Sequence, residues 1–206
     1  MRTVELPSVV LLVIRHGEQV RSGQDGPLTE RGLRQAQALA GAIALAPGDM
    51  VVSSSRLRAR QTAEALGAAP EVLDDLDEYR FGPTWDWHLA AQREDLALWR
   101  PEHHAGDESM GAFQVRVDRA MEGLVRRTVA GRLIVCVHSG VIDAILRWAF
   151  GLAPDTPWTT EAAVPHTSIT ELVHWPSGRH AQGAPRHTLL VRIGDARHLP
   201  AALTTE

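Results

Sequence analysis

Two apolar runs in this chain each end in a histidine that is closely followed by a glycine. Residues 9–14 (VVLLVI) lead into Arg15 and His16, and residues 133–137 (LIVCV) lead into His138. Runs of this composition are typical of strands buried on both faces of a sheet. In open α/β sheets, ligands bind just beyond the carboxyl ends of strands. A surface turn explains one such histidine, whereas two such strand ends favour a common ligand site.

These residue types suit phosphoryl transfer if Arg15, His16, His138, Glu78 and an arginine of residues 56–60 meet in one crevice. Guanidinium groups match phosphate oxygens with paired hydrogen bonds. An imidazole nitrogen can attack phosphorus, and a neutral carboxylic acid can protonate the departing alkoxide. Cationic side chains then stabilise the charge that a metal ion stabilises elsewhere. The residues therefore predict chemistry that needs no metal and no cofactor.

Three arginines, Arg56, Arg58 and Arg60, stand in the first turn of a helix predicted over residues 56–66. Cations at a helix N-terminus oppose the helix dipole, so the pattern indicates a site for an anion. Residues two apart do not share a helix face, so one or two of the three can enter a pocket. Arg56 and Arg60 are expected to be solvated.

An acidic cluster at residues 74–78 ends in Glu78 and is followed by Tyr79, Phe81 and Gly82. Acidic clusters are usually solvated loops. The aromatic residues indicate partial burial here, which would raise the pKa of a carboxyl group.

The elements that would position these residues alternate between strand and helix, which predicts one three-layer α/β/α sandwich with a mostly parallel central sheet. Further extended segments are predicted at residues 50–52, 71–76, 168–175 and 188–193, the last two as an edge hairpin. Helices are predicted at residues 30–46 after an N-cap at Thr29, at 85–99, at 110–130 after an N-cap at Ser109, and at 141–150. The apolar positions of the two capped helices are Leu33, Ala36, Leu39, Ala40 and Ile43, and Phe113, Val117, Ala120, Met121 and Leu124.

The bulk composition describes an ordinary globular chain, predicted as a single domain over residues 1–206. A net charge of −4 gives no basic field, so nucleic acid is not an expected partner. No apolar run reaches the roughly 18 residues that span a bilayer, and no signal peptide is evident, so neither membrane nor export is expected. The single cysteine, Cys136, predicts a buried inert thiol and a reducing, cytoplasmic location. The pair His103 and His104 is expected at the surface.

Five motifs in order resemble the histidine phosphatase superfamily, branch 1, the phosphoglycerate mutase-like branch. They are Arg15-His16-Gly17-Glu18, Leu28-Thr29-Glu30-Arg31-Gly32, residues 54–63 with Arg58, residues 76–82 with Glu78, and His138-Ser139-Gly140. Residues 106–109, 167–170 and 195–199 also resemble segments of this family. The match extends over nearly the whole chain, and it implies the phosphoglycerate mutase-like fold.

The resemblance implies a role for each matched residue. His16 would be the nucleophile that forms a phosphohistidine, with the Gly17 carbonyl fixing its tautomer. Arg15, Arg58 and His138 would hold the phosphoryl oxygens. Glu78 would act as general acid for the leaving group and then as base for water. Further phosphate contacts would come from Ser22, Gln24 and Ser139. No metal site is implied.

Several positions depart from the family pattern without removing one of these catalytic residues. Such departures are Gln19, Ser22, Ser55, Arg56, Ser139, Asp143 and His166. They leave the part of the site that reads the substrate undefined.

A metal-independent phosphomonoesterase is the leading interpretation. A phosphoglycerate mutase is the second, disfavoured because the chain lacks the longer loops and tail of such mutases. A catalytically silent domain that binds a phosphorylated ligand or a protein is the third.

A small phosphorylated metabolite is the expected substrate, with a phosphoprotein as the alternative. Trp85, Trp87 and Trp99 either cap the leaving group or anchor the core. The oligomeric state is not predicted.

Overall fold

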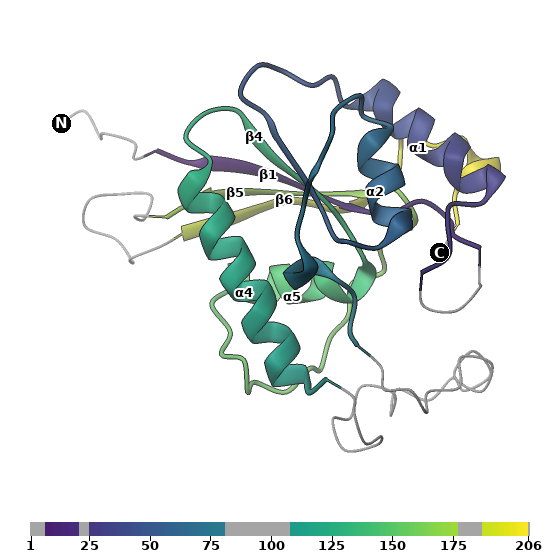
Figure 1. Cartoon of the computed structure of the whole chain (residues 1–206). Helices are drawn as coiled ribbons and strands as arrows, with labels where there is room; N and C mark the ends of the chain where they lie inside the picture. Colours follow the sequence, from purple (N-terminus) through teal and green to yellow (C-terminus); the bar gives the residue numbers. More distant parts are fainter. Residues whose placement is uncertain (1–6, 21–24, 81–107, 177–186, 206) are drawn as a thin grey trace.

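The computed structural model describes residues 7–20, 25–80, 108–176 and 187–205 (Figure 1). The strands are β1 Val9–Arg15, β2 Met50–Ser53, β3 Glu71–Val72, β4 Arg132–Val137, β5 Ile169–Trp175 and β6 His187–Asp195. The helices are α1 Glu30–Ala42, α2 Leu57–Glu64, α4 Met110–Arg127 and α5 Ser139–Ala149, with short 3-10 turns at Asp74–Leu76 and Ala201–Leu203. Within these ranges the strands form one sheet in the order β3-β2-β4-β1-β5-β6.

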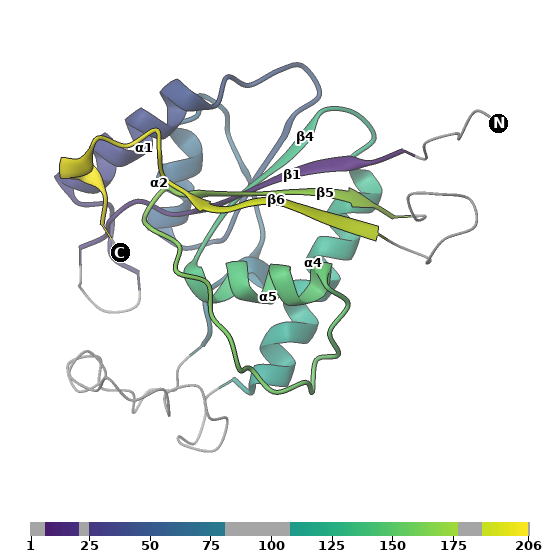
Figure 2. The same cartoon turned by 180° about the vertical axis from the view of Figure 1, so that it is seen from behind.

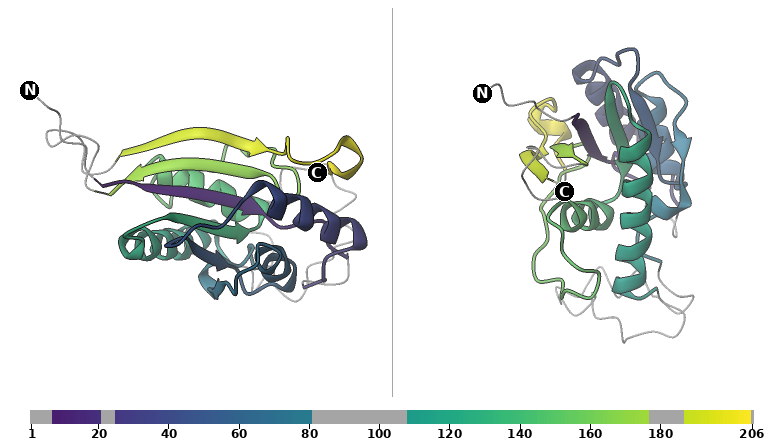
Figure 3. Two further views of the ribbon diagram at one scale, coloured as in Figure 1. Left: turned by 90° about the horizontal axis from the view of Figure 1, so that it is seen from above. Right: turned by 90° about the vertical axis from the view of Figure 1, so that its left-hand side faces the viewer.

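The sheet is mostly parallel and is covered on both faces, as the sequence predicts. Strands β3, β2, β4 and β1 run parallel, while β5 pairs antiparallel with β1 and β6 with β5. Helices α1 and α2 cover one face, and α4 and α5 cover the other (Figures 1 and 2). The two further views separate these layers (Figure 3). The predicted three-layer α/β/α architecture and the edge pair β5–β6 are therefore confirmed.

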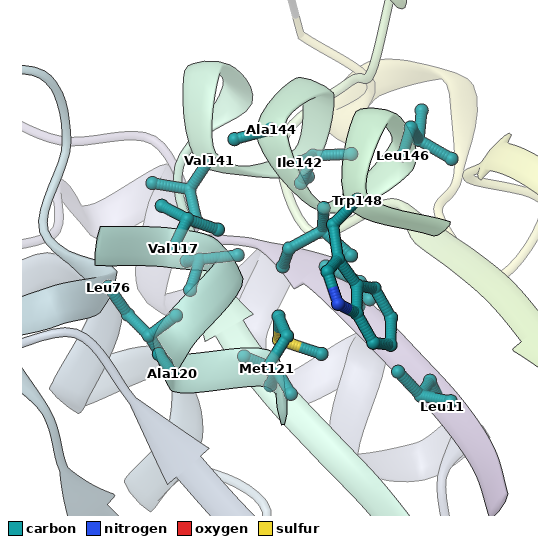
Figure 4. Close-up of a cluster of buried hydrophobic side chains, with 14 of the residues drawn as sticks. Leu11, Leu76, Val117, Ala120, Met121, Val141, Ile142, Ala144, Leu146 and Trp148 are labelled. Atoms are coloured by element: carbon teal, nitrogen blue, oxygen red, sulfur yellow. The ribbon is translucent and has the colours of Figure 1, made fainter. Parts of the chain in front are cut away.

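Strand β1 lies in the middle of the sheet because its apolar side chains are buried on both faces. Leu11 and Val13 belong to the larger core cluster with α4 and α5, whereas Leu12 and Ile14 join the cluster under α1 and α2. Figure 4 shows Val117, Ala120 and Met121 of α4 packed with residues of α5 and with Leu11. The predicted apolar stripe of α4 is fully buried. These contacts fix the position at which β1 ends.

Both predicted N-caps are present. Thr29 accepts the backbone N–H of Gly32 at 2.9 Å, and Ser109 accepts that of Ala112 at 3.1 Å. Such caps satisfy backbone donors that the first helical turn leaves without intrahelical partners. They set the start of α1 and α4 at the predicted residues.

Helix α1 differs from its prediction in length and in its buried face. It ends at Ala42, not at residue 46, because Ile43 is already extended and its N–H closes the last turn on the Leu39 carbonyl. Leu33 is 46% exposed, although the spacing predicts it as buried. The buried face instead includes Gln35, a polar residue whose amide forms hydrogen bonds within the protein.

The segment predicted as extended over residues 71–76 is extended only at β3. A 3-10 turn follows at Asp74–Leu76 and buries Leu76 completely. The turn directs the carbonyls of Asp75 and Asp77 onto the buried guanidinium of Arg116, at 2.8 and 2.7 Å. In a straight strand these two carbonyls would point the same way but lie about 6.6 Å apart, too far for one guanidinium nitrogen to contact both.

Several predictions fall outside the described residues. They concern Ser22, Gln24, the helix at 85–99 with its three tryptophans, and the histidines at 103 and 104. Cys136 is buried as predicted, and burial raises the pKa of its thiol to about 12. Among the helices of the described ranges, none is both long and apolar enough to cross a bilayer.

Candidate active site

The ends of β1 and β4 place the two histidines beside each other. Arg15 at the end of β1 pairs in register with Val137 at the end of β4, so His16 and His138 follow at the same edge of the sheet. Their ring centroids lie 5.1 Å apart. Arg58, from the first turn of α2, donates a hydrogen bond from Nε to Nε2 of His16 at 3.2 Å. The structure thus brings His16, His138 and Arg58 together beyond the carboxyl ends of parallel strands.

The ring of His16 is held neutral, with its lone pair on Nε2. Nδ1 lies 2.8 Å from the carbonyl oxygen of Gly17, which can only accept, so Nδ1 carries the hydrogen. Burial, together with the guanidinium of Arg58, holds the pKa of His16 well below its usual range. A Cβ on Gly17 would lie 2.7 Å from the carbonyl oxygen of Gly32, so only glycine fits this loop. An unprotonated Nε2 is what a nucleophilic imidazole requires.

His138 is fully buried, and its Nε2 lies 2.7 Å from the hydroxyl of Ser54, at the end of β2. Burial first, and Arg58 second, hold the pKa of His138 well below its usual range. Nδ1 has no hydrogen-bond partner in the described part of the chain. When the Ser54 hydroxyl donates to Nε2, Nδ1 carries the hydrogen and can donate to a ligand. Nothing in the sequence alone singled out Ser54 from the neighbouring serines.

The arginines of the 56–60 group separate into three environments. Arg58 is buried, and burial lowers its pKa although Glu78 raises it. Arg60 is exposed, as predicted. The expectation for Arg56 is wrong: its side chain is only 22% exposed and pairs with the buried carboxylate of Asp77 at 3.5 Å. Helical spacing therefore allows one of the three to reach His16.

Glu78 reaches the site from the segment after β3. Its Oε1 accepts the N–H of Tyr79 at 3.0 Å, and its Oε2 accepts that of Gly140, in the first turn of α5, at 3.2 Å. A Cβ on Gly140 would lie 2.5 Å from Oε1, so glycine is required for this approach. Burial raises the pKa of Glu78, against the lowering effect of these two bonds and of Arg58. The carboxyl group can therefore hold a proton closer to neutral pH than an ordinary glutamate.

Arg116 supports this segment and was missed in the sequence. It stands within the apolar stripe of α4 and is buried. Its guanidinium donates to the carbonyls of Asp77 and Glu78 at 2.7 and 3.1 Å, and to both carboxylate oxygens of Glu108 at 2.6 and 2.8 Å. A charged residue at a core-facing position of an amphipathic helix is the signal that could have found it.

The remaining predicted residues are less closely tied to this cluster. Arg15 donates from Nη1 to the carbonyl of Val164 at 2.6 Å and helps to lower the pKa of His16. Ser139 is the partly exposed first residue of α5. Ser22 and Gln24 lie outside the described residues.

Two departures from the family pattern lie close to the cluster. The ring of His166 is 5.6 Å from that of His16 between centroids. Asp143, one turn into α5, accepts the N–H of Ala162 at 2.9 Å, and burial raises its pKa to about 7. The sequence alone assigned neither residue a role.

A search of the described ranges for three or more converging His, Cys, Asp or Glu side chains, as metal ligation requires, finds none. The nearest cations to His16 are guanidinium groups. The arrangement can hold an anion against a neutral imidazole, with a protonatable carboxyl group nearby.

Comparison with known proteins agrees with this geometry. The chain is 30% identical over 158 residues to the adenosylcobalamin/alpha-ribazole phosphatase of Salmonella typhimurium, covering 66% of this chain and 77% of that protein. It is 29% identical over 164 residues to a metal-independent phosphoserine phosphatase of Arabidopsis thaliana, covering 69% of each. The fold is similar to that of a mycobacterial glucosyl-3-phosphoglycerate phosphatase, with a TM-score of 0.72 and 22% identity over 92% of this chain and 100% of that one.

These relatives are phosphatases, which agrees with a hydrolase. Residues 11–184 match the family described as the histidine phosphatase superfamily (branch 1). The matched range contains His16, Arg58, Glu78 and His138. The chain therefore belongs to the histidine phosphatase superfamily, branch 1.

Proposed function

We propose that this protein is a metal-independent phosphomonoesterase that works through a phosphohistidine on His16. The observation that carries the proposal is the bond from Nδ1 of His16 to the Gly17 carbonyl, because it leaves the Nε2 lone pair facing the guanidinium of Arg58. Arg58 donates to that lone pair at 3.2 Å. A phosphate oxygen is a stronger acceptor for a guanidinium than a neutral imidazole is. Substrate binding would therefore draw Arg58 away and release the nucleophile.

The first step forms a bond from Nε2 of His16 to phosphorus and breaks the bond from phosphorus to the ester oxygen. The departing alkoxide takes the proton of Glu78, whose raised pKa favours the protonated form. Arg15, Arg58 and Nδ1 of His138 would stabilise the charge on the phosphoryl oxygens. Ser22, Gln24 and Ser139 are candidates for further contacts.

The second step hydrolyses the intermediate. Glu78, now ionised, takes a proton from water, and the resulting hydroxide attacks phosphorus while the bond to Nε2 breaks. Inorganic phosphate leaves, and His16 returns to its neutral form while Glu78 regains its proton. The cycle is balanced with no group besides water and the ester.

A small phosphorylated metabolite is the proposed substrate class. The relatives are phosphatases named for alpha-ribazole, phosphoserine and glucosyl-3-phosphoglycerate, which are small molecules of different chemical structure. The net charge of −4 does not favour a polyanionic partner such as nucleic acid.

The test is hydrolysis of p-nitrophenyl phosphate in excess EDTA by the wild type, His16→Ala and the control His187→Ala, which removes an exposed histidine of β6. We expect the wild type and the control to be active and His16→Ala to be inactive. Acid-labile, base-stable label from a radioactive phosphoester should appear on the wild type alone. Activity that disappears with EDTA, or that survives in His16→Ala, contradicts the mechanism.

A mutase is distinguished by its products. With phosphoglycerates as substrates, we expect release of inorganic phosphate to exceed formation of the isomer. Efficient interconversion with no net hydrolysis would replace the phosphatase by a mutase. Tight binding of a phosphorylated ligand with no turnover would indicate a silent binding domain.

A further inference from the structure

The residue behind the nucleophile has a strained backbone. Thr167 has a φ of 57°, the only positive value among the non-glycine residues of the described ranges, and it is fully buried. A β-branched residue in this region is an outlier that the surrounding structure must enforce. Its N–H donates to the carbonyls of Arg15 and His16 at 3.0 and 3.3 Å. Thr167 therefore holds the backbone of Arg15 and His16, two residues of the candidate active site.

The same turn places the side chain of His166 beside the ring of His16, with 5.6 Å between ring centroids. His166 is 8% exposed. Its Nδ1 lies 3.0 Å from the hydroxyl and 3.3 Å from the carbonyl oxygen of Thr205. Because the carbonyl can only accept, Nδ1 carries the hydrogen. The backbone N–H of His166 donates to the same carbonyl at 2.9 Å. The C-terminal tail thus fixes His166 by both backbone and side chain.

Gln35 connects that tail to the other side of the nucleophile. Its side chain is fully buried in α1. Nε2 donates to the Leu203 carbonyl at 2.7 Å and to the Thr205 hydroxyl at 2.8 Å, while Oε1 accepts the N–H of Glu18 at 2.7 Å. Both N–H donors of its amide go to the tail, and its oxygen accepts from residue 18, two positions after His16. A buried amide satisfied in this way specifies one arrangement of the segments it joins.

We propose that Gln35, His166 and Thr205 form a clasp that positions His16, so that the C-terminal tail is a working part of the active site. The proposal rests on the proposed role of His16 as nucleophile. The clasp holds the catalytic residue from both directions along the chain, through Glu18 after it and through the 166–167 turn beside it. Gln35, His166 and Thr205 are positioning residues, because they act through His16 and its backbone.

The first experiment replaces Thr205 and its neighbour by the same residue. Thr205→Val removes the hydroxyl that Gln35 and His166 share, and Thr205→Ser restores it. Thr204→Val is the matched control, because Thr204 is exposed and, among the described residues, its hydroxyl bonds to the Pro200 carbonyl alone, at 3.4 Å and within the tail. We expect kcat for p-nitrophenyl phosphate to fall by about 10-fold in Thr205→Val, with KM changed by less than about twofold, since misplacement of a catalytic group lowers the rate more than binding. Thr205→Ser and Thr204→Val should resemble the wild type.

The second experiment measures the pKa of His16, by an NMR titration that does not require turnover and by a pH–rate profile that does. The titratable and charged groups that the structure places around His16 are Arg15 from β1, Arg58 from α2, His138 after β4 and His166. Because His166 lowers the pKa of His16, His166→Asn should raise the pKa of His16 measured by NMR of its ring protons. The acid limb of the kcat/KM profile should move to higher pH in the same direction. A purely structural role for His166 would lower the rate without moving this limb.

The outcomes separate the clasp from the function. Unchanged kcat in Thr205→Val, a loss shared by Thr204→Val, or a loss that Thr205→Ser does not recover would each overturn the clasp. So would an unchanged pKa of His16 in His166→Asn. Absence of all activity in the wild type would instead contradict the proposed function, and the NMR titration would then decide the clasp alone.

Discussion

Two regions in the described part of this molecule gather arginines beside a histidine, and we propose that one of them binds an anion. The first is the proposed catalytic crevice with Arg58 and His16. The second is a groove of about 400 Å³ on the sheet face that carries α1. Its apolar floor comes from β1, β5 and the end of α1. Its charged and polar rim is formed by Arg132, Glu171, Arg192, Asp195, Arg197 and His198.

The two regions differ in where the carboxylates stand. Along the groove, Arg192 pairs with Glu171 and Asp195, each at 2.8 Å, and Arg132 pairs with Asp49 at 2.5 Å. In the crevice, Arg58 contacts the neutral imidazole of His16 at 3.2 Å, and the carboxylate of Asp25 is 4.0 Å away and half exposed.

The pKa values of the carboxyl groups differ between the two regions in the same sense. Hydrogen bonds from Arg132 lower the pKa of Asp49 to about 2, whereas burial raises that of Glu78. We infer that the carboxylates distinguish the two regions: the arginines of the groove form close ion pairs, whereas the ion pair of Arg58 with Asp25 is long and half exposed. In the groove the same residue type stabilises the fold.

The largest expected effect comes from exchanging the two kinds of arginine for the same apolar residue. Arg58→Met should lower kcat/KM for p-nitrophenyl phosphate by about 10³-fold, because it removes a preorganised donor to the phosphoryl oxygens. Arg192→Met, in the groove, should stay within about twofold of the wild type. Steady-state kinetics, with a thermal melt of each variant to verify folding, make the comparison. Comparable losses in both variants would show that the two regions do not differ in function.

The next effect concerns the carboxyl group of the crevice. Glu78→Gln should lower kcat/KM, which reports the first step alone, for an alkyl phosphate by about 10²-fold or more, since an alkoxide must be protonated as it leaves. The loss should be smaller for p-nitrophenyl phosphate, whose leaving group is stable as an anion. In the wild type, activity on the alkyl ester should fall as pH rises through the raised pKa of Glu78, because the acid form is then lost. Equal losses on both esters would argue against Glu78 as the general acid.

The sequence predicts the residues of the crevice better than the buried polar residues that hold them in place, because the former leave a local pattern in the chain. His16 and His138 were found because strands buried on both faces have a distinctive apolar pattern that ends abruptly at a polar residue. Arg58 was found with the family motif, although helical spacing alone left the choice among three arginines open. These signals are local in the chain.

Gln35, Arg116 and His166 were not found because their roles depend on long-range contacts. Gln35 joins residues 18 and 205, and Arg116 joins helix α4 to the carbonyls of residues 75–78. A polar residue on a helix is expected to face water, and only the fold shows which of them face inward. Leu33 was predicted as buried and is exposed for the same reason. The face of α1 that turns inward contains Gln35, and Leu33 lies outside that face.

The next prediction concerns the free energy of unfolding and the ion pair between Asp49 and Arg132 beside the groove, where a smaller effect is expected. Asp49 is 2% exposed, and its pKa lies below the ordinary 3.8 at about 2, so its ionised form stabilises the fold. This contribution is complete above pH 3.8 and is lost as pH falls through about 2. Asp49→Asn should lower the free energy of unfolding by about 2 kcal/mol at pH 7, with kcat unchanged.

Urea unfolding at pH 7 and at intervals from pH 4 to pH 2 measures this difference. Glu71→Gln is the control, because its pair with Arg127 lies at the surface, where such pairs contribute about 0.5 kcal/mol. The gap between wild type and Asp49→Asn should narrow over the acidic range. A gap that stays constant with pH would mean that Asp49 acts through packing and not through its charge.

The smallest effect is the stabilisation by inorganic phosphate, and it tests most directly which arginines form the anion site. At ten times its Kd, phosphate should raise the free energy of unfolding by about 1.4 kcal/mol, because it binds the folded state alone. For a chain of this size that is a rise of about 4 °C in Tm. Arg192→Met should show the full rise, and Arg58→Met should show none, with potassium chloride at matched ionic strength as the control. The reverse result would place phosphate in the groove, where Arg132, Arg192 and Arg197 each pair with a carboxylate. It would mean that these paired guanidinium groups bind an anion better than Arg58, which is buried beside the neutral imidazole of His16.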